Sequence, residues 1–311
     1  MKYLYIDNLL RYIKRSIFNM AKKFTKHIIF ILLAIGLIVL GIGCSVAAPE
    51  QKATSSQAQS ISVKGSDSVL PLAQAEAEEF LNENSGKSVS VTGGGSGVGI
   101  AALIDGQVNI ATASREMTTD EIKKANTNGI KPVEHVIAYD GITVIVHPKN
   151  PISKLTYNQL QGIYNGSISN WKQVDGEDKQ ISVISRDTSS GTYADFKKDV
   201  LLGDEVRPDA LTQATTGGIV TEVAHNQNAI GYIGFAYVDN NIKVLSLDKG
   251  NGSVLPTTQS ILSGTYPLSR SLYFYTNGEP KEGLTKDFCD FVLSEKGQNI
   301  VSEVGFIPRK K

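Results

Sequence analysis

Three short turns in this 311-residue sequence place hydroxyl side chains and glycines between a β-branched run and a helix-forming run. They are Ser66-Asp67-Ser68, Gly94-Gly95-Ser96-Gly97 and the turn from Asp187 to Thr192. The first backbone N–H groups of a helix have no partner within the helix and carry the positive end of its dipole. Glycine also lets a ligand approach the backbone closely. Together the three turns predict the capture of one small oxyanion.

A single turn of this kind has a second interpretation, because Ser and Thr are also ordinary N-cap residues that need no ligand. Three such turns with glycine, the third preceded by Arg186, favour an anion site over three ordinary caps. A fourth turn, Thr118 to Glu121, has the sequence of a capping box, whose own side chains satisfy the free N–H groups. We expect no ligand at that fourth turn.

The glycine-rich segment 93–99, GGGSGVG, does not match the known nucleotide-binding loops. It lacks the Gly-Lys-Ser/Thr ending of a P-loop, and its glycines do not reproduce the G-x-G-x-x-G spacing of a dinucleotide site. A nucleophile at Ser96 or Ser190 would need an adjacent base or a metal, and the four histidines show no metal-ligand spacing. We therefore expect a binding protein without catalytic residues, metal or cofactor.

Short strands alternate with amphipathic helices from Ile61 onward. The predicted strands are 61–65, 88–93, 108–114, 133–148, 180–186, 229–235 and 271–277. The predicted helices are 69–83, 97–105, 119–128, 156–164, 192–202, 216–226 and 284–297. This alternation predicts βαβ units, a mostly parallel sheet and an α/β fold. Ligands of such folds bind beyond the carboxyl ends of the strands, which is where all three turns lie.

The length fits two α/β lobes better than one large sheet. The apolar run 142–146 is a natural place for the chain to pass from the first lobe to the second, and SLYFYT a natural place to return. We therefore expect residues 61–145 and 272–311 to form lobe 1, and residues 146–271 to form lobe 2.

Residues 1–44 have the order of a secretory signal. Lys22, Lys23 and Lys26 precede an apolar run of 15 residues, Ile28 to Ile42, and a polar stretch follows Gly43-Cys44. The run is shorter than the roughly 20 residues that a membrane-spanning helix needs, which favours cleavage over a permanent span. Because the compact signal begins at Met20, that residue is a candidate start of translation, with Met1 as the alternative.

Cys44 follows a small residue at the end of the apolar run, as the acceptor of a bacterial-type lipoprotein signal does. Gly41 stands where that pattern usually has Leu, so an uncleaved anchor with an unmodified cysteine stays open. Residues 45–60 are rich in Ala, Ser and Gln, which predicts a flexible tether. Either anchor would hold the folded part outside the cell, on the outer face of the cytoplasmic membrane.

The net charge of zero conceals an asymmetry. Residues 1–44 hold seven of the 31 basic and one of the 31 acidic side chains, which leaves 24 basic and 30 acidic residues and a net charge of −6 for the remainder. A nucleic-acid partner would require a basic domain or stripe, so we expect none. An anion would have to be captured by local geometry, against the overall field of the protein.

Several motifs in combination resemble one known family. They are GSDSVLP, GGGSGVGIAAL, ATASREM, AYDGITVIVHP, SRDTSSGT and NAIGYIGFAYV. In order and spacing, from about Ile61 to the C-terminus, they resemble the phosphate-binding protein of the high-affinity phosphate ABC transporter. The resemblance implies a two-lobed periplasmic-binding-protein fold of type II, with the ligand cleft between the lobes and two chain crossovers. It also implies a monomer that binds inorganic phosphate and delivers it to a membrane permease.

The resemblance also implies which residues bind phosphate. It places the donors at Ser68, at the N–H groups of Val69 and Leu70, and at Ser96. The motif Arg-x-x-x-Ser-Gly-Thr falls on Arg186, Ser190, Gly191 and Thr192. We expect Arg186 to bind two phosphate oxygens through bidentate hydrogen bonds.

Discrimination from sulfate depends on an acceptor for the phosphate proton, because sulfate has no proton to donate. Some family members supply an Asp in the segment matching ATASREM, where Arg115 stands here. We expect Asp140 to be the acceptor instead, with Asp187 and Asp67 as further candidates, although Asp140-Gly141 is also a common turn pair. Arg115 either contacts phosphate or orients Asp140. The alternatives are a binding protein for sulfate or molybdate, and a tethered sensor or adhesin on the same scaffold.

Overall fold

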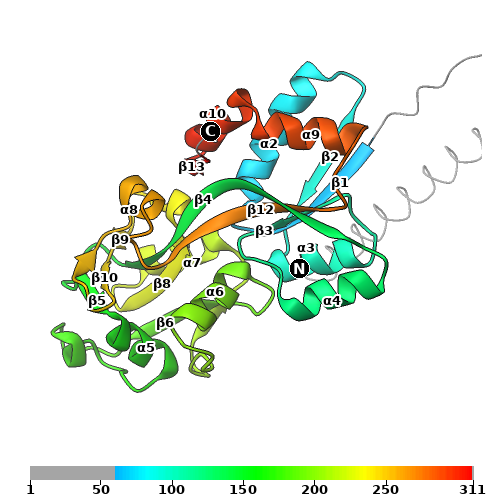
Figure 1. Cartoon of the computed structure of the whole chain (residues 1–311). Coiled ribbons are helices and arrows are strands. Elements are labelled where there is room, and N and C mark those ends of the chain that lie inside the picture. The colour runs from blue at the N-terminus through cyan, green and yellow to red at the C-terminus, as the bar shows by residue number, and fades with distance from the viewer. Residues whose placement is uncertain (1–59, 310–311) are drawn as a thin grey trace, which may run out of the picture. The chain divides into compact units, whose positions relative to one another are not determined.

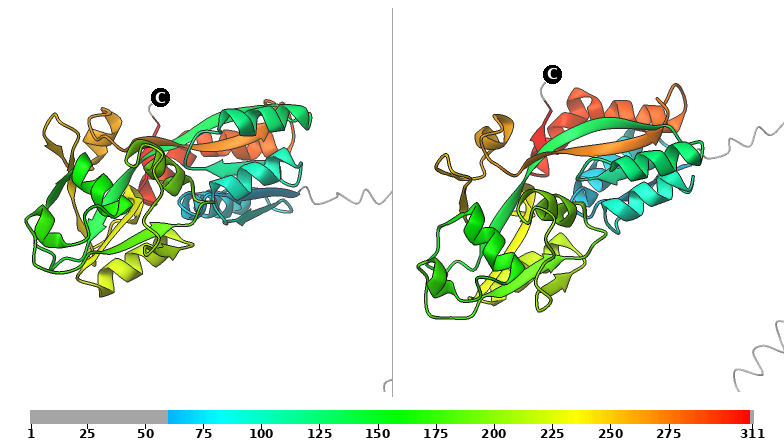
Figure 2. Two further views of the ribbon diagram at one scale, coloured as in Figure 1. Left: turned by 90° about the horizontal axis from the view of Figure 1, so that it is seen from below. Right: turned by 60° about the horizontal axis from the view of Figure 1, so that its bottom comes forward.

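The computed structural model describes residues 60–309, and these form two lobes joined by two long strands (Figure 1). The predicted signal, Cys44 and nearly all of the predicted tether lie outside the described residues. The connecting strands are β4 (Pro132–Val146) and β12 (Ser269–Asn277), which pair in antiparallel fashion. Both views in Figure 2 show them running together from one lobe into the other.

The first lobe contains a mixed sheet in the order β2-β1-β3-β12-β4. Its other strands are β1 (Ser60–Gly65), β2 (Ser88–Thr92), β3 (Ile110–Ala113) and β13 (Ile307–Pro308). Its helices are α2 (Leu70–Glu83), α3 (Ser96–Ile104), α4 (Thr119–Thr127), α9 (Leu284–Leu293) and α10 (Glu295–Glu303). Strands β1, β2 and β3 are parallel, whereas β12 and β4 are each antiparallel to their neighbours. The sheet is therefore less uniformly parallel than the sequence predicts.

Helices cover both faces of this sheet because its central strands are apolar on both sides. Along β12, Leu272 and Phe274 pack with α2, α9 and α10, whereas Tyr273 and Tyr275 pack with α3 and α4. This alternation follows from the two-residue period of a strand. Phe288 of α9 lies within 5.4 Å of Phe80 of α2, ring centre to ring centre, which fixes the C-terminal helices on the first lobe.

The second lobe extends the same sheet through β8, β6 and β7. Its strands are β6 (Ser182–Arg186), β7 (Leu211–Gln213), β8 (Ala229–Gly234) and β9 (Lys243–Val244), with a small separate sheet of β5 (Lys154–Thr156), β10 (Ser246–Asp248) and β11 (Ser253–Val254). Its helices are α5 (Tyr157–Asn165), η1 (Trp171–Val174), α6 (Gly191–Asp199), α7 (Thr216–His225), η2 (Phe235–Tyr237) and α8 (Thr258–Leu262). Tyr164, Phe196 and Tyr232 form the centre of one buried cluster, and Ile219 and Val223 belong to another.

Strand β4 changes partners as it crosses between the lobes. Residues 132–141 pair with β12, and residues 142–146 pair with β8. The lobe limits expected from the sequence, 145/146 and 271/272, thus fall within β4 and β12. The crossover strands carry the chain past the cleft, and residues on them can contact both lobes.

The predicted helix 284–297 is two helices in the structure. Ser294 is extended, with φ −70° and ψ 169°, and its hydroxyl accepts a hydrogen bond from the Gly297 N–H at 3.2 Å. Serine serves here as the N-cap of α10, so the chain ends one helix and starts another within a single residue. The sheet of β5, β10 and β11 was not predicted either, because its strands are only two or three residues long.

Candidate anion site

The three predicted turns each lead into a helix. Helix α2 begins at Leu70, α3 at Ser96 and α6 at Gly191. Within residues 60–309, no side chain caps α2 or α3, whereas Ser190 caps α6 by accepting from the Tyr193 N–H. Only one of the three turns is therefore an ordinary N-cap, and the other two keep N–H groups available to a ligand.

The hydroxyl groups of the first and third turns meet between the lobes. Ser68 Oγ lies 3.0 Å from Thr192 Oγ1 and 3.4 Å from Thr216 Oγ1. All three residues are at most 2% exposed. Ser68 belongs to the first lobe, and Thr192 and Thr216 lie in the first turns of helices of the second. Hydroxyl groups of both lobes are thus in direct hydrogen-bond contact at this point.

The second turn closes the site from another direction. Ser96 Oγ lies 3.3 Å from Ser114 Oγ and accepts a hydrogen bond from the Ser114 N–H at 3.1 Å. Gly191 faces this pair: a Cβ atom at Gly191 would lie 2.3 Å from Ser96 Oγ and 2.6 Å from Ser114 Oγ. Only glycine fits at that contact between the lobes.

Two residues of this constellation, Ser114 and Thr216, were not identified from the sequence. Ser114 stands directly before Arg115 in the segment ATASREM, and Thr216 is the first residue of a predicted helix. Each carried a signal that could have found it, a hydroxyl at the end of a strand or at the start of a helix.

The N–H groups of the first turn differ from the expectation. The Val69 N–H already donates to the Ser66 carbonyl at 3.2 Å. Proline at position 71 has no N–H, and it lies in the first turn of the helix, where that loss is tolerated. The Leu70 N–H is therefore the better placed of the two expected backbone donors.

Arg186 is buried at the centre of the site, with its side chain 2% exposed. Its Nε donates to the Gln213 carbonyl, its Nη1 to Thr216 Oγ1, and its Nη2 to Asp67 Oδ2 and the Ala214 carbonyl, at 2.8–3.2 Å. A guanidinium has five N–H groups. One Nη1–H is left without a hydrogen-bond partner among residues 60–309, so Arg186 has one free donor for an anion in this arrangement.

Arg115 has a different partner from those the sequence suggested. Its Nη1 and Nη2 donate to the two carboxylate oxygens of Glu121, each at 2.8 Å, and Nη1 also donates to the Glu116 carbonyl. Glu121 belongs to the capping box of α4, which forms as predicted. The pairing of Arg115 with Asp140 is therefore wrong, because Glu121 occupies the guanidinium.

Asp140 is instead paired with Arg270, a residue that the sequence did not single out. Arg270 Nε and Nη2 donate to Asp140 Oδ2 at 3.1 and 2.8 Å, and the Phe235 N–H donates to Oδ1 at 2.8 Å. Asp140 is 1% exposed, so its charge is compensated entirely within the protein.

The other two acceptor candidates are also engaged. Asp67 accepts hydrogen bonds from the Gly94 N–H at 3.0 Å and from Arg186. Asp187 accepts from the N–H and the hydroxyl of Ser189. Each carboxylate considered for the phosphate proton thus already binds donors of the protein.

Direct contacts join the lobes around the site. The Gly97 N–H donates to the Ser189 carbonyl at 3.0 Å, and Ser189 Oγ lies 3.1 Å from the Gly94 carbonyl oxygen. Tyr237 Oη donates to the Asp67 carbonyl at 2.8 Å. These contacts hold the two lobes directly against each other around the site.

Residues 60–309 contain no cluster of three or more His, Cys, Asp or Glu side chains arranged to hold a metal ion. They also contain no helix that is both long and apolar enough to cross a bilayer.

The sequence is similar to known proteins over most of its length. Residues 50–296 match the PBP superfamily domain. The phosphate-binding protein PstS of Borreliella burgdorferi is 37% identical over 218 residues, covering 67% of this chain and 75% of that protein. The phosphate-binding protein PstS of Bacillus subtilis is 31% identical over 290 residues, covering 90% of this chain and 93% of that protein.

Solved structures give the same result. A Clostridium perfringens protein, crystallised with bound phosphate and described as a candidate substrate-binding protein of a phosphate ABC transporter, is 36% identical; the match has a TM-score of 0.74 and covers 81% of this chain and all of that chain. An ABC-type phosphate transport receptor from Vibrio cholerae is 34% identical, with a TM-score of 0.67, over 80% of this chain and all of that chain. The chain therefore belongs to the PBP superfamily and, within it, to the substrate-binding proteins of phosphate ABC transporters.

Proposed function

We propose that this protein captures inorganic phosphate between its two lobes and delivers it to the membrane permease of an ABC importer. The observation that carries the proposal is the meeting of buried groups from both lobes: the Ser68 hydroxyl contacts that of Thr192, and Gly191 packs against the Ser96 hydroxyl. The names of its relatives and the bound phosphate of the Clostridium perfringens structure support phosphate as that anion.

The proposed contacts come from both lobes. The set keeps Ser68, Val69, Leu70, Ser96, Arg186, Ser190, Gly191 and Thr192, and adds Ser114 and Thr216. Arg115 and Asp140 lie one layer out, because Glu121 and Arg270 already bind their charged atoms. The anion is thus held by hydroxyl and N–H dipoles and by one N–H of Arg186, while each nearby arginine charge is balanced by an aspartate. Such donors can bind an anion tightly where water is excluded.

The phosphate proton needs an acceptor that is not one of these carboxylates. Ser114 Oγ is our choice, since no N–H group of the described part of the chain donates to it, whereas Ser96 Oγ accepts from the Ser114 N–H. A hydroxyl oxygen can accept a hydrogen bond from HPO₄²⁻ without the like-charge repulsion that a carboxylate would bring against sulfate. Discrimination against sulfate should therefore be milder than in a site with a free carboxylate.

Sulfate or molybdate is the second candidate ligand, and the engagement of all three carboxylates is the observation that favours it. Isothermal titration of the purified protein with phosphate, sulfate and molybdate separates the candidates. Tighter binding of phosphate supports the proposal; equal affinities, or no phosphate binding, would contradict it. A tethered sensor or adhesin would bind phosphate but would not support its uptake, so a phosphate-uptake assay in cells lacking the protein distinguishes that function.

We further propose that the protein works as a monomer outside the cytoplasmic membrane. Cleavage before Cys44 and lipidation of its thiol would anchor it to the outer face, and residues 45–60 would give it reach to the permease. Replacement of Cys44 by Ala should then release the protein from the membrane or leave the signal uncleaved. Retention of both processing and membrane attachment in the Cys44→Ala variant would rule out the lipid anchor.

A further inference from the structure

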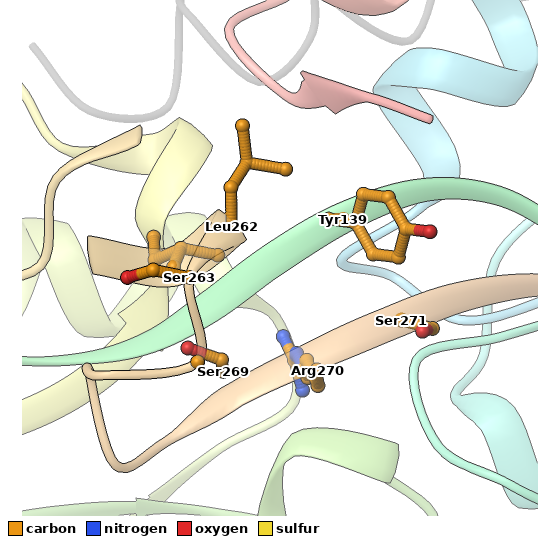
Figure 3. Close-up of a pocket in the computed structure, with 8 residues that line it drawn as sticks. Tyr139, Leu262, Ser263, Ser269, Arg270 and Ser271 are labelled. Atoms are coloured by element: carbon orange, nitrogen blue, oxygen red, sulfur yellow. The ribbon is translucent and has the colours of Figure 1, made fainter. Parts of the chain in front are cut away.

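Arg270 lies where the two crossover strands meet the anion site. It is paired across the sheet with Asp140, one residue before β4 changes from β12 to β8 as its partner. Figure 3 shows Arg270 on β12 between Ser269 and Ser271, with Tyr139 on the neighbouring strand β4. The side chain is 6% exposed. Nε and Nη2 bind Asp140, and Nη1 donates to Thr192 Oγ1 at 3.0 Å.

The direction of the bond to Thr192 follows from chemistry. A guanidinium only donates hydrogen bonds, so Thr192 Oγ1 must be the acceptor. The hydroxyl hydrogen of Thr192 is then free to point towards the first lobe, where Ser68 Oγ lies 3.0 Å away. We infer that Arg270 is a positioning residue of the site, which holds the Thr192 hydroxyl as a donor to the bound anion. This inference rests on the proposed function of phosphate capture.

A second arginine repeats the arrangement. Arg186 is paired with Asp67 and donates through Nη1 to Thr216 Oγ1 at 3.0 Å. Thr216 Oγ1 faces Ser68 Oγ as Thr192 Oγ1 does. Each buried arginine thus donates to a threonine hydroxyl beside Ser68, and a hydroxyl that accepts from a charged donor becomes a stronger donor itself.

The position of Arg270 is fixed by contacts on both strands. Asp140 holds two of its nitrogens and also accepts the Phe235 N–H, at the start of η2. Asp195 is a second carboxylate near Arg270, with Oδ2 4.0 Å from Nη1. That distance exceeds hydrogen-bond range, whereas the bond to Thr192 has normal geometry. Thr192 is therefore the hydrogen-bond partner of Nη1, and a variant of Asp195 can serve as the control.

A double-mutant cycle tests the inference. Removing Arg270 alone would leave Asp140 as an unpaired buried charge, so the perturbing variant is Asp140→Asn/Arg270→Met, combined with Thr192→Val. Phosphate dissociation constants would be measured by calorimetry for the wild type, each variant and the combination. We expect each change alone to weaken phosphate binding about tenfold or more, the loss of one hydrogen bond to an anion.

The combination is the decisive measurement. If Arg270 acts through Thr192, the phosphate dissociation constant of the triple variant should lie within about threefold of that of Thr192→Val. Both changes would then remove the same hydrogen bond from the Thr192 hydroxyl. If Asp140→Asn/Arg270→Met weakens phosphate binding by the same factor with and without Thr192→Val, the inference is overturned. Wild-type phosphate affinity in Asp140→Asn/Arg270→Met would overturn it as well. Asp195→Asn should keep wild-type affinity; a tenfold loss there would reassign Nη1 to Asp195. A wild-type protein that binds no phosphate would instead overturn the proposed function and, with it, this inference.

Discussion

A Cβ atom at Gly191, on the second lobe, would lie 2.3 Å from the Oγ atom of Ser96, on the first. Contacts this short do not occur between a real Cβ and a neighbouring oxygen, so the lobes can approach to this distance only because residue 191 is glycine. The contact between the lobes therefore requires a residue without a Cβ atom at position 191.

Replacement of Gly191 by Ala should prevent closure. We expect phosphate affinity to fall more than about 100-fold, because a misplaced methyl keeps the lobes apart. The midpoint of thermal unfolding without phosphate should change little, since Gly191 does not have a positive φ and alanine favours helices. Calorimetry and thermal melts test both expectations.

Gly217 provides the matched control. It lies in the first turn of α7, and a Cβ there would meet nothing within 4 Å. Gly217→Ala should bind phosphate normally. Normal binding by Gly191→Ala would contradict the closed geometry described for the site.

Ser114→Ala tests the proposed acceptor of the phosphate proton. The variant removes an oxygen that only phosphate can use as an acceptor, so we expect phosphate affinity to fall about tenfold and sulfate affinity to change less. The ratio of the two dissociation constants is the readout. Ser90→Ala, on the exposed side of β2, serves as the control for serine removal. Equal losses of affinity for phosphate and sulfate would show that Ser114 does not accept the hydrogen bond from the phosphate proton.

Arg115→Gln tests whether Arg115 stabilises the first lobe through its ion pair or contacts the anion. Because the guanidinium binds Glu121, we expect the free energy of unfolding to fall by about 1–2 kcal/mol. Phosphate affinity should stay within about threefold of the wild type. Denaturant unfolding and calorimetry measure the two quantities. A loss of affinity of tenfold or more, with unfolding unchanged, would place Arg115 in contact with the anion.

Glu76 should make the stability of the protein depend on pH. It is fully buried in α2, neither of its carboxylate oxygens has a hydrogen-bond partner in the described structure, and burial raises its pKa from 4.5 to about 9. The folded protein therefore keeps the proton that the unfolded chain releases above its ordinary pKa. The contribution of Glu76 to stability is fully present below about pH 4.5 and is lost as pH rises towards 9.

The variant Glu76→Gln removes this titration. We expect its free energy of unfolding to exceed that of the wild type by about 1–3 kcal/mol near pH 8 and to differ little near pH 4.5. Glu78→Gln, on the exposed side of the same helix, should show no such pH-dependent gain. Parallel pH profiles for the wild type and Glu76→Gln would contradict the assignment.

The sequence predicts those parts of the site that depend on local structure. Ser68, Ser96 and the residues from Ser190 to Thr192 follow from turns whose hydroxyls and glycines sit at helix starts, and the structure brings these turns together. The order of strands and helices follows in the same way from local apolar patterns, except where a single cap such as Ser294 divides a helix.

Long-range pairs could not be predicted in this way. Arg270 and Asp140 are 130 residues apart, and their bond exists only because β12 lies against β4. The position of Arg115 in a family motif suggested a phosphate contact, whereas its partner Glu121 was predicted only as a capping residue of a helix. The ion pairs around the site depend on the tertiary fold. The sequence alone does not give the distances between these charged side chains.

A crystal structure of the phosphate complex tests the central claim most directly. We expect one phosphate enclosed between the lobes, with its oxygens in hydrogen-bond contact with the hydroxyls of Ser68, Ser96 and Thr192. Phosphate bound elsewhere, or a complex whose lobes do not meet across Ser96 and Gly191, would contradict it.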